Sequence, residues 1–434
     1  NYRPPGRLWQ GTMSHQFSHL PTTAHGMVIG ELWRKQSRPT LYITTHDRAM
    51  ESVADELAFF APDAEVLMFP AWDVMPYDRI SPKASLMADR IATLTRLLNS
   101  AGKPYILLTT VAAILQKLAP REALAGASVH IKTTDHVPTD RLIELLLRLG
   151  YRRAGKAMEA GEFAVRGSLM DVIPAGNQEG IRIDWFGDEI ETIKRFDPMT
   201  QVSSGICTDF SLHPTSEVLL NDDTVSQFRH HYRELFGAVS KEDTLYDAIS
   251  RQQPQAGMEH FLPLFYAHTH SLFDYAAGAL LVLDDEAQKA ASERFETIED
   301  YYNARVEADK AGARSPFASE QKYHPIPPNL AFVNTTEWQQ IIQREDCCHL
   351  SSFASNGTAT DLGIRPLFTL VQNDASRTPL DQLKEQLERA QPQQKILAIA
   401  CMSHGSRDRL QHLLLDRGQH AVLVEDARAL HTLK

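Results

Sequence analysis

Residues Met158 to Asp197 read MEAGEFAVRGSLMDVIPAGNQEGIRIDWFGDEIETIKRFD. Apolar and polar side chains alternate in short runs separated by glycines, which predicts β-strands joined by tight turns. Within IRIDWF, the two-residue period of a strand divides the side chains into an apolar set and a mixed set: Ile181, Ile183 and Trp185, and Arg182, Asp184 and Phe186. The apolar set is the expected core face of a compact β module.

The mixed set is unusual for a strand that has one buried face. Such a strand normally carries only polar side chains toward water, whereas here Phe186 shares a face with an arginine and an aspartate. Aromatic and arginine side chains are enriched at the energetic centres of protein interfaces, so this face is a candidate binding surface. The alternative is that Phe186 enters a second small core or packs beneath a loop.

Three separated blocks of the sequence resemble one protein family. GEFAVRGSLMDVIPAG and IRIDWFGDEIETIKRFD are similar to the UvrA-binding domain that the excision-repair protein UvrB shares with the bacterial transcription-repair coupling factors (Mfd). FPAWDVMPYDRISPKASLMADRIATL, from Phe69 to Leu94, and AGMEHFLPLF, from Ala256 to Phe265, resemble the first domain of the coupling factors. The resemblance covers most of residues 20–285 well and the part after about residue 325 only loosely.

The resemblance assigns roles to three residues of the β module. It aligns Arg166 in AVRG, and Arg182 and Phe186 in RIDWF, with the arginines and the aromatic residue that contact UvrA in this family. Guanidinium groups offer rigid forks for carboxylates of a partner, and an aromatic ring between them offers an apolar anchor. The implied partner is UvrA, and the implied function is recruitment of nucleotide excision repair to stalled RNA polymerase.

Alternation along the preceding strand places Glu162, Ala164 and Arg166 on one face. Arg166 therefore joins the other two candidate residues if the two strands are neighbours. For Asp171 and Asp184 we expect structural roles, in which they either orient the arginines or cap turns.

Length and composition indicate a globular chain of several domains. By the usual domain size, 434 residues make about three domains. The formal net charge of −11 argues against the whole chain being a nucleic-acid clamp, since phosphate binding depends on basic patches. Four cysteines match neither a disulfide framework nor a zinc-site spacing, which indicates reduced thiols. We expect a bacterial cytoplasmic protein without a membrane span or signal peptide, and the missing initiator methionine suggests a fragment.

Strands and helices alternate on both sides of the β module. Before it, apolar strand segments alternate with amphipathic helical segments, at 40–46, 49–60, 66–69, 85–100, 105–110 and 111–118. After it, a helix over 222–236 and the apolar strand GALLVLDD at 278–285 are expected to return to the same sheet. The predicted fold class is α/β, a parallel-sheet domain with an inserted mainly-β domain, followed by a small α/β domain. The resemblance identifies the first domain as degenerate helicase-like and the insert as UvrA-binding.

We expect four segments along the chain. They are the first part of the parallel-sheet domain, the insert, the remainder with a connector helix, and a small α/β domain of unassigned role, at 1–125, 126–213, 214–315 and 325–434. The proline-rich YHPIPPNL predicts a linker before the last domain. In that domain KILAIACMS and AVLVED are expected strands between helices.

An ATPase is the main alternative to a binding function, because UvrB and related helicases have a phosphate-binding loop early in this kind of domain. The corresponding stretch is LPTTAHGMVIGELW, at 20–33, and no GKS or GKT occurs in the chain. We therefore expect Gly26 and Gly30 to serve a turn and close packing, and Asp284 and Asp285 to form a strand-end turn. We expect that the chain is not an enzyme and that it binds no cofactor. The alternative is a nucleic-acid-dependent ATPase fragment with an atypical phosphate-binding loop.

Other catalytic or metal-binding patterns are weaker. The pairs His230–His231 and His268–His270 lack a matching carboxylate or cysteine pattern in sequence, so surface or packing roles are expected. Nothing in the sequence predicts that Glu31 and Asp47 converge. No catalytic or metal-binding residue is therefore predicted.

Further expectations rest on the resemblance. The stretch from Met75 to Leu86 is too short and polar for the DNA-clamping hairpin of UvrB. The family's RNA-polymerase-binding domain and its motor, which uses ATP and magnesium and moves on DNA, would lie beyond Lys434. The family also implies that another domain masks the UvrA-binding surface inside the full protein. An architectural interaction protein unrelated to repair is a third possibility.

Overall fold

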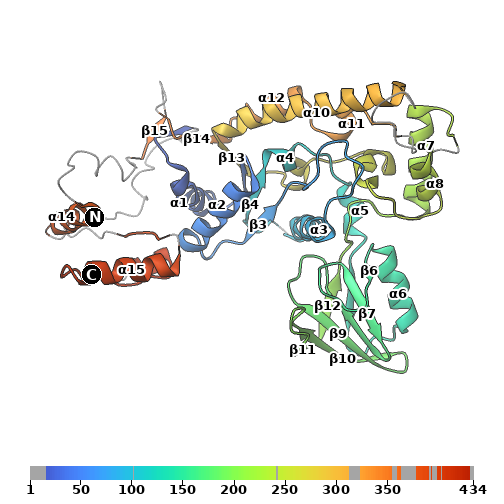
Figure 1. Cartoon of the computed structure of the whole chain (residues 1–434), viewed down its shortest axis with the longest axis horizontal. Helices are drawn as coiled ribbons and strands as arrows, with labels where there is room; N and C mark the ends of the chain where they lie inside the picture. The colour runs from blue at the N-terminus through green and yellow to red at the C-terminus, as the bar shows by residue number, and fades with distance from the viewer. Residues whose placement is uncertain are drawn as a thin grey trace.

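The computed structural model describes residues 16–100, 102–240, 243–311, 323–353, 359–362, 378–390, 392, 398–401 and 403–430. A parallel sheet with helices on both faces forms the larger part, and a second, mainly antiparallel sheet projects from it (Figure 1). The predicted α/β fold with a mainly-β insert is confirmed.

The parallel sheet has seven strands, in the order β15-β1-β14-β13-β2-β4-β3. All of its pairings are parallel. Its strands are β1 (Gln16–Ser18), β2 (Thr40–Thr44), β3 (Val66–Phe69), β4 (Ile106–Thr110), β13 (Leu280–Asp284), β14 (Cys347–Leu350) and β15 (Thr360–Asp361). Every residue of β2, β4 and β13 is buried, as their continuous apolar runs require of strands covered on both faces.

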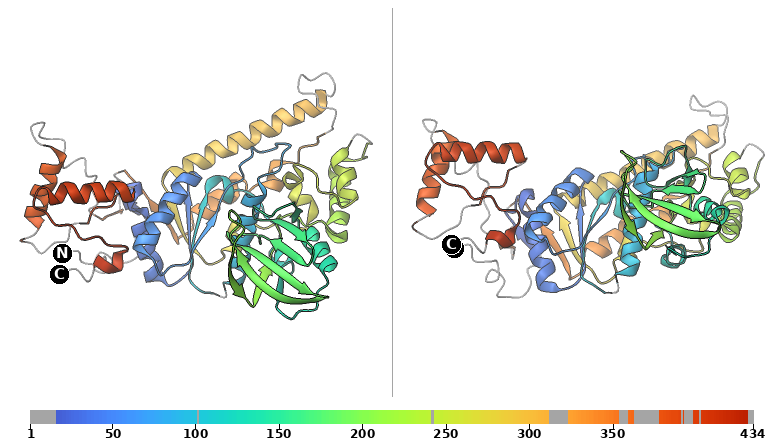
Figure 2. Two further views of the ribbon diagram at one scale, coloured as in Figure 1. Left: turned by 60° about the horizontal axis from the view of Figure 1, so that its bottom comes forward. Right: turned by 90° about the horizontal axis from the view of Figure 1, so that it is seen from below.

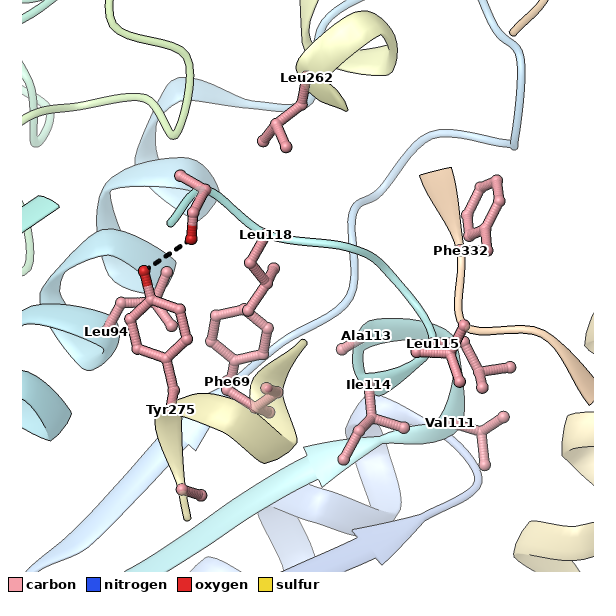
Figure 3. Close-up of a cluster of buried hydrophobic side chains, with 14 of the residues drawn as sticks. Phe69, Leu94, Val111, Ala113, Ile114, Leu115, Leu118, Leu262, Tyr275 and Phe332 are labelled. Carbon is pink, nitrogen blue, oxygen red and sulfur yellow. Dashed lines mark hydrogen bonds between the residues drawn. The ribbon is translucent and has the colours of Figure 1, made fainter. Parts of the chain in front are cut away.

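Helices cover the two faces of this sheet. One face packs on α1 (His25–Gln36) and α2 (Asp47–Phe60). The other face packs on the remaining helices near the sheet, which are α3 (Ala84–Asn99), α4 (Val111–Ile114), α10 (Glu286–Ala311) and α12 (Thr335–Ile342). Figure 3 shows part of this second core, where Phe69, Leu94 and Leu118 meet and the Tyr275 hydroxyl donates to the carbonyl of Ala119 at 2.9 Å.

The insert begins and ends with two paired strands. These are β5 (Val129–Lys132) and β12 (Asp209–Leu212), which form a separate two-stranded sheet. Between them lie α6 (Thr139–Arg148) and a six-stranded sheet in the order β11-β10-β9-β8-β7-β6. Its strands are β6 (Arg152–Arg153), β7 (Glu162–Arg166), β8 (Leu169–Val172), β9 (Gly180–Phe186), β10 (Glu189–Phe196) and β11 (Ser203–Cys207). Helix α6 packs its apolar side on one face of this sheet.

The other helices of the described residues complete the fold. They are η2 (Thr22–Ala24), α5 (Arg121–Ala125), α7 (Asp222–Phe236), α8 (Thr244–Ser250), η3 (Met258–Phe265), α9 (Leu272–Tyr275), α11 (Pro328–Ala331), α14 (Pro379–Ala390), α15 (His404–Leu415) and α16 (Ala427–Leu430). Helices α14 and α15 lie beyond the β15 end of the parallel sheet, on the side away from the insert (Figure 2).

Three expectations differ from the structure. The helix expected over 111–118 ends at Ile114, because Gln116 and Leu118 form backbone bridges with Phe332 and His270. The boundary expected at residue 325 also differs, since β14 lies inside the first sheet between β1 and β13. Among the described residues of KILAIACMS and AVLVED no strand forms, although helices α14 and α15 are present.

Candidate protein-binding face of the inserted β domain

The alternation predicted for β9 is present in the structure. Ile181, Ile183 and Trp185 are at most 5% exposed and pack in the core under α6. The indole Nε1 of Trp185 donates to the carbonyl of Val137 at 2.8 Å, which satisfies the buried donor. Phe186 at the end of the strand is 79% exposed, the outcome expected for a binding face.

The second small core that could have taken up Phe186 exists, but Phe196 fills it instead. Phe196 is fully buried with Ala157, Ala164 and Ile173 on the outer side of the sheet. Its ring lies against Gly180, where an added Cβ would come within 2.2 Å of the ring carbons. Phe186 is not part of this cluster and stays in contact with solvent.

Arg166 lies on the same outer face but two strands from β9. It pairs across the ladder with Leu169 of β8, and Leu169 pairs in turn with Asp184 of β9. The two strands are therefore not neighbours, contrary to the condition under which Arg166 was expected to join the face. Residues paired directly across a ladder nevertheless point to the same side of the sheet, so Arg166 shares a face with Asp184. Arg166 is exposed, and its Nη2 donates to the carbonyl of Gly155 at 3.2 Å.

The guanidinium of Arg182 forms an ion pair with an acidic neighbour on the adjacent strand. Its Nε and Nη2 donate to the two carboxylate oxygens of Asp171 at 2.7 and 2.9 Å, a two-pronged pair in which Asp171 is buried. These hydrogen bonds raise the pKa of Arg182 above its ordinary value. The guanidinium also lies 5.0 Å from the centre of the Phe196 ring. Asp171 thus orients the arginine, as expected, and Asp184 accepts from the hydroxyl of Ser168 at 3.0 Å.

Exposed apolar side chains continue along the face. Lys194 pairs with Arg182 on one side and with Ile206 of the edge strand β11 on the other, which places these residues in one row across the sheet. Ile206 is exposed, as are Val202 and Met199 in the preceding turn. These residues were not predicted from the sequence, because SSGIC is too short and too polar to show the alternation of a strand. The isolated apolar residues near it are the only sequence feature that could have indicated an exposed apolar surface.

The N-terminus of α1 holds a carboxylate of this chain, at the place where a phosphate loop was considered. The Gly26 amide donates to Oε2 of Glu56 at 2.7 Å. A Cβ on Gly26 would lie 2.4 Å from the Glu56 Cβ, and one on Gly30 would lie 3.1 Å from the Ala61 Cβ, so both glycines serve close packing as expected. Burial raises the pKa of Glu56 to about 7, against the opposing effect of the Gly26 amide.

Asp284 and Asp285 hold the carboxyl end of β13. Asp284 accepts from the Thr44 hydroxyl at 3.1 Å and from the Glu286 amide at 3.2 Å, and Asp285 accepts from the Ser351 hydroxyl at 2.8 Å. Burial raises the pKa of Asp284. Both residues line a cavity of about 420 Å³ that also borders His25, which is buried and whose pKa burial lowers to about 4. Their contacts fit the expected strand-end turn.

The histidine pairs have different surroundings. His230 lies 3.8 Å from Glu234, and both are exposed. Beside His268 and His270 lies a carboxylate that the sequence pattern did not show, because Oε1 of Glu122 in α5 lies 2.9 Å from Nε2 of His268. This glutamate is distant in sequence, so no local spacing pattern could reveal it. Glu31 pairs with Arg34 at 2.8 Å.

Comparison with known proteins identifies the insert. Residues 129–218 match the model of the UvrB interaction domain, a range that contains the whole six-stranded sheet. Transcription-repair-coupling factors match most of the chain. That of Rickettsia prowazekii is 34% identical over 62% of this chain and 24% of its own length, and that of Haemophilus influenzae is 31% identical over 69% and 26%. That of Escherichia coli is 26% identical over 91% of this chain and 33% of its own length.

The chain thus spans about a quarter to a third of the length of these relatives. Within the described ranges, no helix is both long and apolar enough to cross a membrane.

Proposed function

The chain belongs to the transcription-repair-coupling factor family, as an N-terminal region, and we propose that it recruits UvrA to stalled transcription without catalysing a reaction itself. The insert, which we place at about residues 126–213, is the proposed UvrA-binding domain. The remaining two thirds to three quarters of the relatives' length is where we propose that RNA polymerase and DNA are bound and ATP is used. The proposed location is the bacterial cytoplasm.

The observation that carries this proposal is the exposure of Phe186 on a face that also presents arginine. Burying a phenylalanine in a partner removes a large apolar surface from water, whereas in the isolated chain 79% of this side chain stays hydrated. Arg166, on the same side, offers an exposed guanidinium for a carboxylate of UvrA. The same surface is what another domain of the full protein would cover in a masked state.

Arg182 contributes in a different way. Two of its nitrogens already serve Asp171, and Nη1 faces the Ser203 hydroxyl at 3.3 Å. The residue therefore offers a fixed positive charge rather than a free two-pronged fork. Removing it would leave Asp171 buried without its partner, so an Arg182→Ala variant would test folding and binding together.

Binding to purified UvrA, measured by calorimetry, tests the proposal. Phe186→Ala and Arg166→Ala remove exposed side chains and are expected to weaken binding at least tenfold each while the fold persists. Leu147→Ala is the matched control, since Leu147 is an exposed apolar residue on α6, which covers the opposite face of the sheet. Failure of the parent chain to bind UvrA, or equal binding by all variants, would refute the proposed role or the proposed face, respectively.

The absence of catalysis is proposed from the α1 N-terminus. The chain has no GKS or GKT sequence, and the Glu56 carboxylate accepts from the Gly26 amide, where a phosphate group would compete with it. Saturable binding of ATP with magnesium by this chain would overturn this part of the proposal.

A further inference from the structure

We propose that Glu122, His268 and His270 form a binding site for a divalent transition-metal ion of the zinc class. Each residue offers one ligand atom, and the three ligand atoms lie within 4.8 Å of one another. Two imidazoles and one carboxylate are a donor set that zinc accepts, with the fourth position left to water. The proposal concerns a part of the chain outside the candidate UvrA-binding face.

The backbone around the site is fixed on both sides. Leu118, shortly before α5, exchanges two backbone hydrogen bonds with His270, of 2.7 and 3.0 Å. The Arg121 amide donates to Nδ1 of His270 at 3.1 Å, and the Arg121 guanidinium donates to the carbonyl of Asp274 at 2.8 Å, which ties α5 to α9. The chain thus brings the three side chains together before any ion binds.

The side chains need only small movements to close on an ion. In a tetrahedral zinc site with bonds of about 2.0–2.2 Å, neighbouring ligand atoms are roughly 3.4 Å apart. Glu122 and His268 have side chains that are more than half exposed and already touch at 2.9 Å, so rotation about their own bonds suffices. The negative charge of Glu122 offsets part of the charge of the ion.

His270 has to change its hydrogen bonding when the ion binds. In the present arrangement its Nδ1 accepts from the Arg121 amide, so the neutral ring carries its proton on Nε2. Coordination through Nε2 requires the ring proton to move to Nδ1, which displaces the Arg121 amide donor, and coordination through Nδ1 displaces the same donor directly. Either route gives up the hydrogen bond from the Arg121 amide to His270.

The position of the site gives the ion a structural role. Glu122 precedes β5, where the insert begins, whereas His268 and His270 follow the insert. A bound ion would join the chain that enters the insert to the chain that returns from it. It would thereby stabilise the base from which the insert projects.

Titration of the tag-free full chain with Zn²⁺ after chelator treatment tests the proposal. The parent is expected to bind one ion with saturation below millimolar concentration, and Co²⁺ in its place is expected to give visible absorption of a four- or five-coordinate site. His268→Ala and Glu122→Gln are expected to weaken binding at least tenfold, and Zn²⁺ is expected to raise the melting temperature of the parent but not of these variants.

His230→Ala is the matched control, because His230 is also an exposed histidine beside a glutamate but belongs to no group of three possible ligands among the described residues. It is expected to bind Zn²⁺ as the parent does. The proposal is overturned if the parent shows no saturable binding, or if the His268 and Glu122 variants bind as tightly as the parent. Circular dichroism of each variant without metal shows whether a loss of binding comes from loss of folding.

Discussion

Replacing Glu56 by glutamine is expected to stabilise the folded chain at alkaline pH. Glutamine retains a side-chain oxygen that can accept from the Gly26 amide, the hydrogen bond that measures 2.7 Å in the parent. It removes the carboxylate charge, whose partial burial beneath α1 raises the pKa of Glu56 from 4.5 to about 7. The substitution therefore separates the cost of burying a charge from the benefit of the hydrogen bond.

The magnitude follows from the pKa. A rise from 4.5 to about 7 corresponds to roughly 3 kcal/mol, since each tenfold change in the proton equilibrium is worth about 1.4 kcal/mol. Glu56 is only partly buried, so screening by water reduces the expected effect to about 1–2 kcal/mol. The folded chain holds the Glu56 proton more tightly than the unfolded chain does. The contribution of Glu56 to the free energy of unfolding is therefore fully present below pH 4.5 and is lost as the pH rises to about 7.

Urea unfolding of the parent and of Glu56→Gln at pH 5 and pH 8 measures the effect. The variant is expected to be more stable by about 1–2 kcal/mol at pH 8 and by much less at pH 5. Glu51→Gln, at an exposed position of the same helix α2, is the control and is expected to change stability by less than about 0.5 kcal/mol at either pH. An equal gain at both pH values, or no gain at pH 8, would refute the account of a buried charge.

Three further predictions concern the insert and its attachment. Arg90→Ala is expected to cost about 3–5 kcal/mol in urea unfolding, because Arg90 and Glu217 form a fully buried pair at 2.9 Å between α3 and the end of the insert. Gly176→Ala is expected to cost about 2–5 kcal/mol, since its φ is +76° and the new Cβ would lie 2.1 Å from a methyl group of α3. Gly187→Ala, with φ +66° and open space around it, is the control and should cost only about 1–2 kcal/mol. Equal losses of stability in the two variants would contradict the steric clash inferred at Gly176. Phe186→Ala is expected to leave the melting temperature unchanged, and a fall of several degrees would show that Phe186 packs within the fold.

Local patterns allowed part of the fold to be predicted. The strand VLMF forms β3 with the expected bounds, and the helix expected over 222–236 is α7. Helix α7 has strong local signals, because the Asn221 side chain accepts from the Thr224 amide and the Thr224 hydroxyl accepts from the Asn221 amide. The two-residue period of β9 likewise separated its buried and exposed sides, since one face of the sheet packs on α6.

Contacts between distant segments could not be predicted in the same way. Strand β14 pairs in parallel with β1 and β13, and such pairings leave no mark in the sequence next to the strand. Its position in the first sheet therefore contradicted a boundary inferred from a proline-rich linker. The same reason hid Glu122 from a search for ligands near His268, because only the folded chain brings them together.

The candidate binding face shows how such contacts change the function inferred for a residue. In the sequence, Arg166 and Arg182 are equivalent arginines on one face. In the structure, the register of β8 with β9 places Asp171 opposite Arg182, and this carboxylate occupies two of the nitrogens that a partner would otherwise use. Arg182 then fixes the charge and shape of the face, while Arg166 and Phe186 retain surface for a partner. In double-mutant cycles that pair each arginine with a carboxylate of UvrA, Arg166 should consequently show a larger coupling free energy of binding than Arg182.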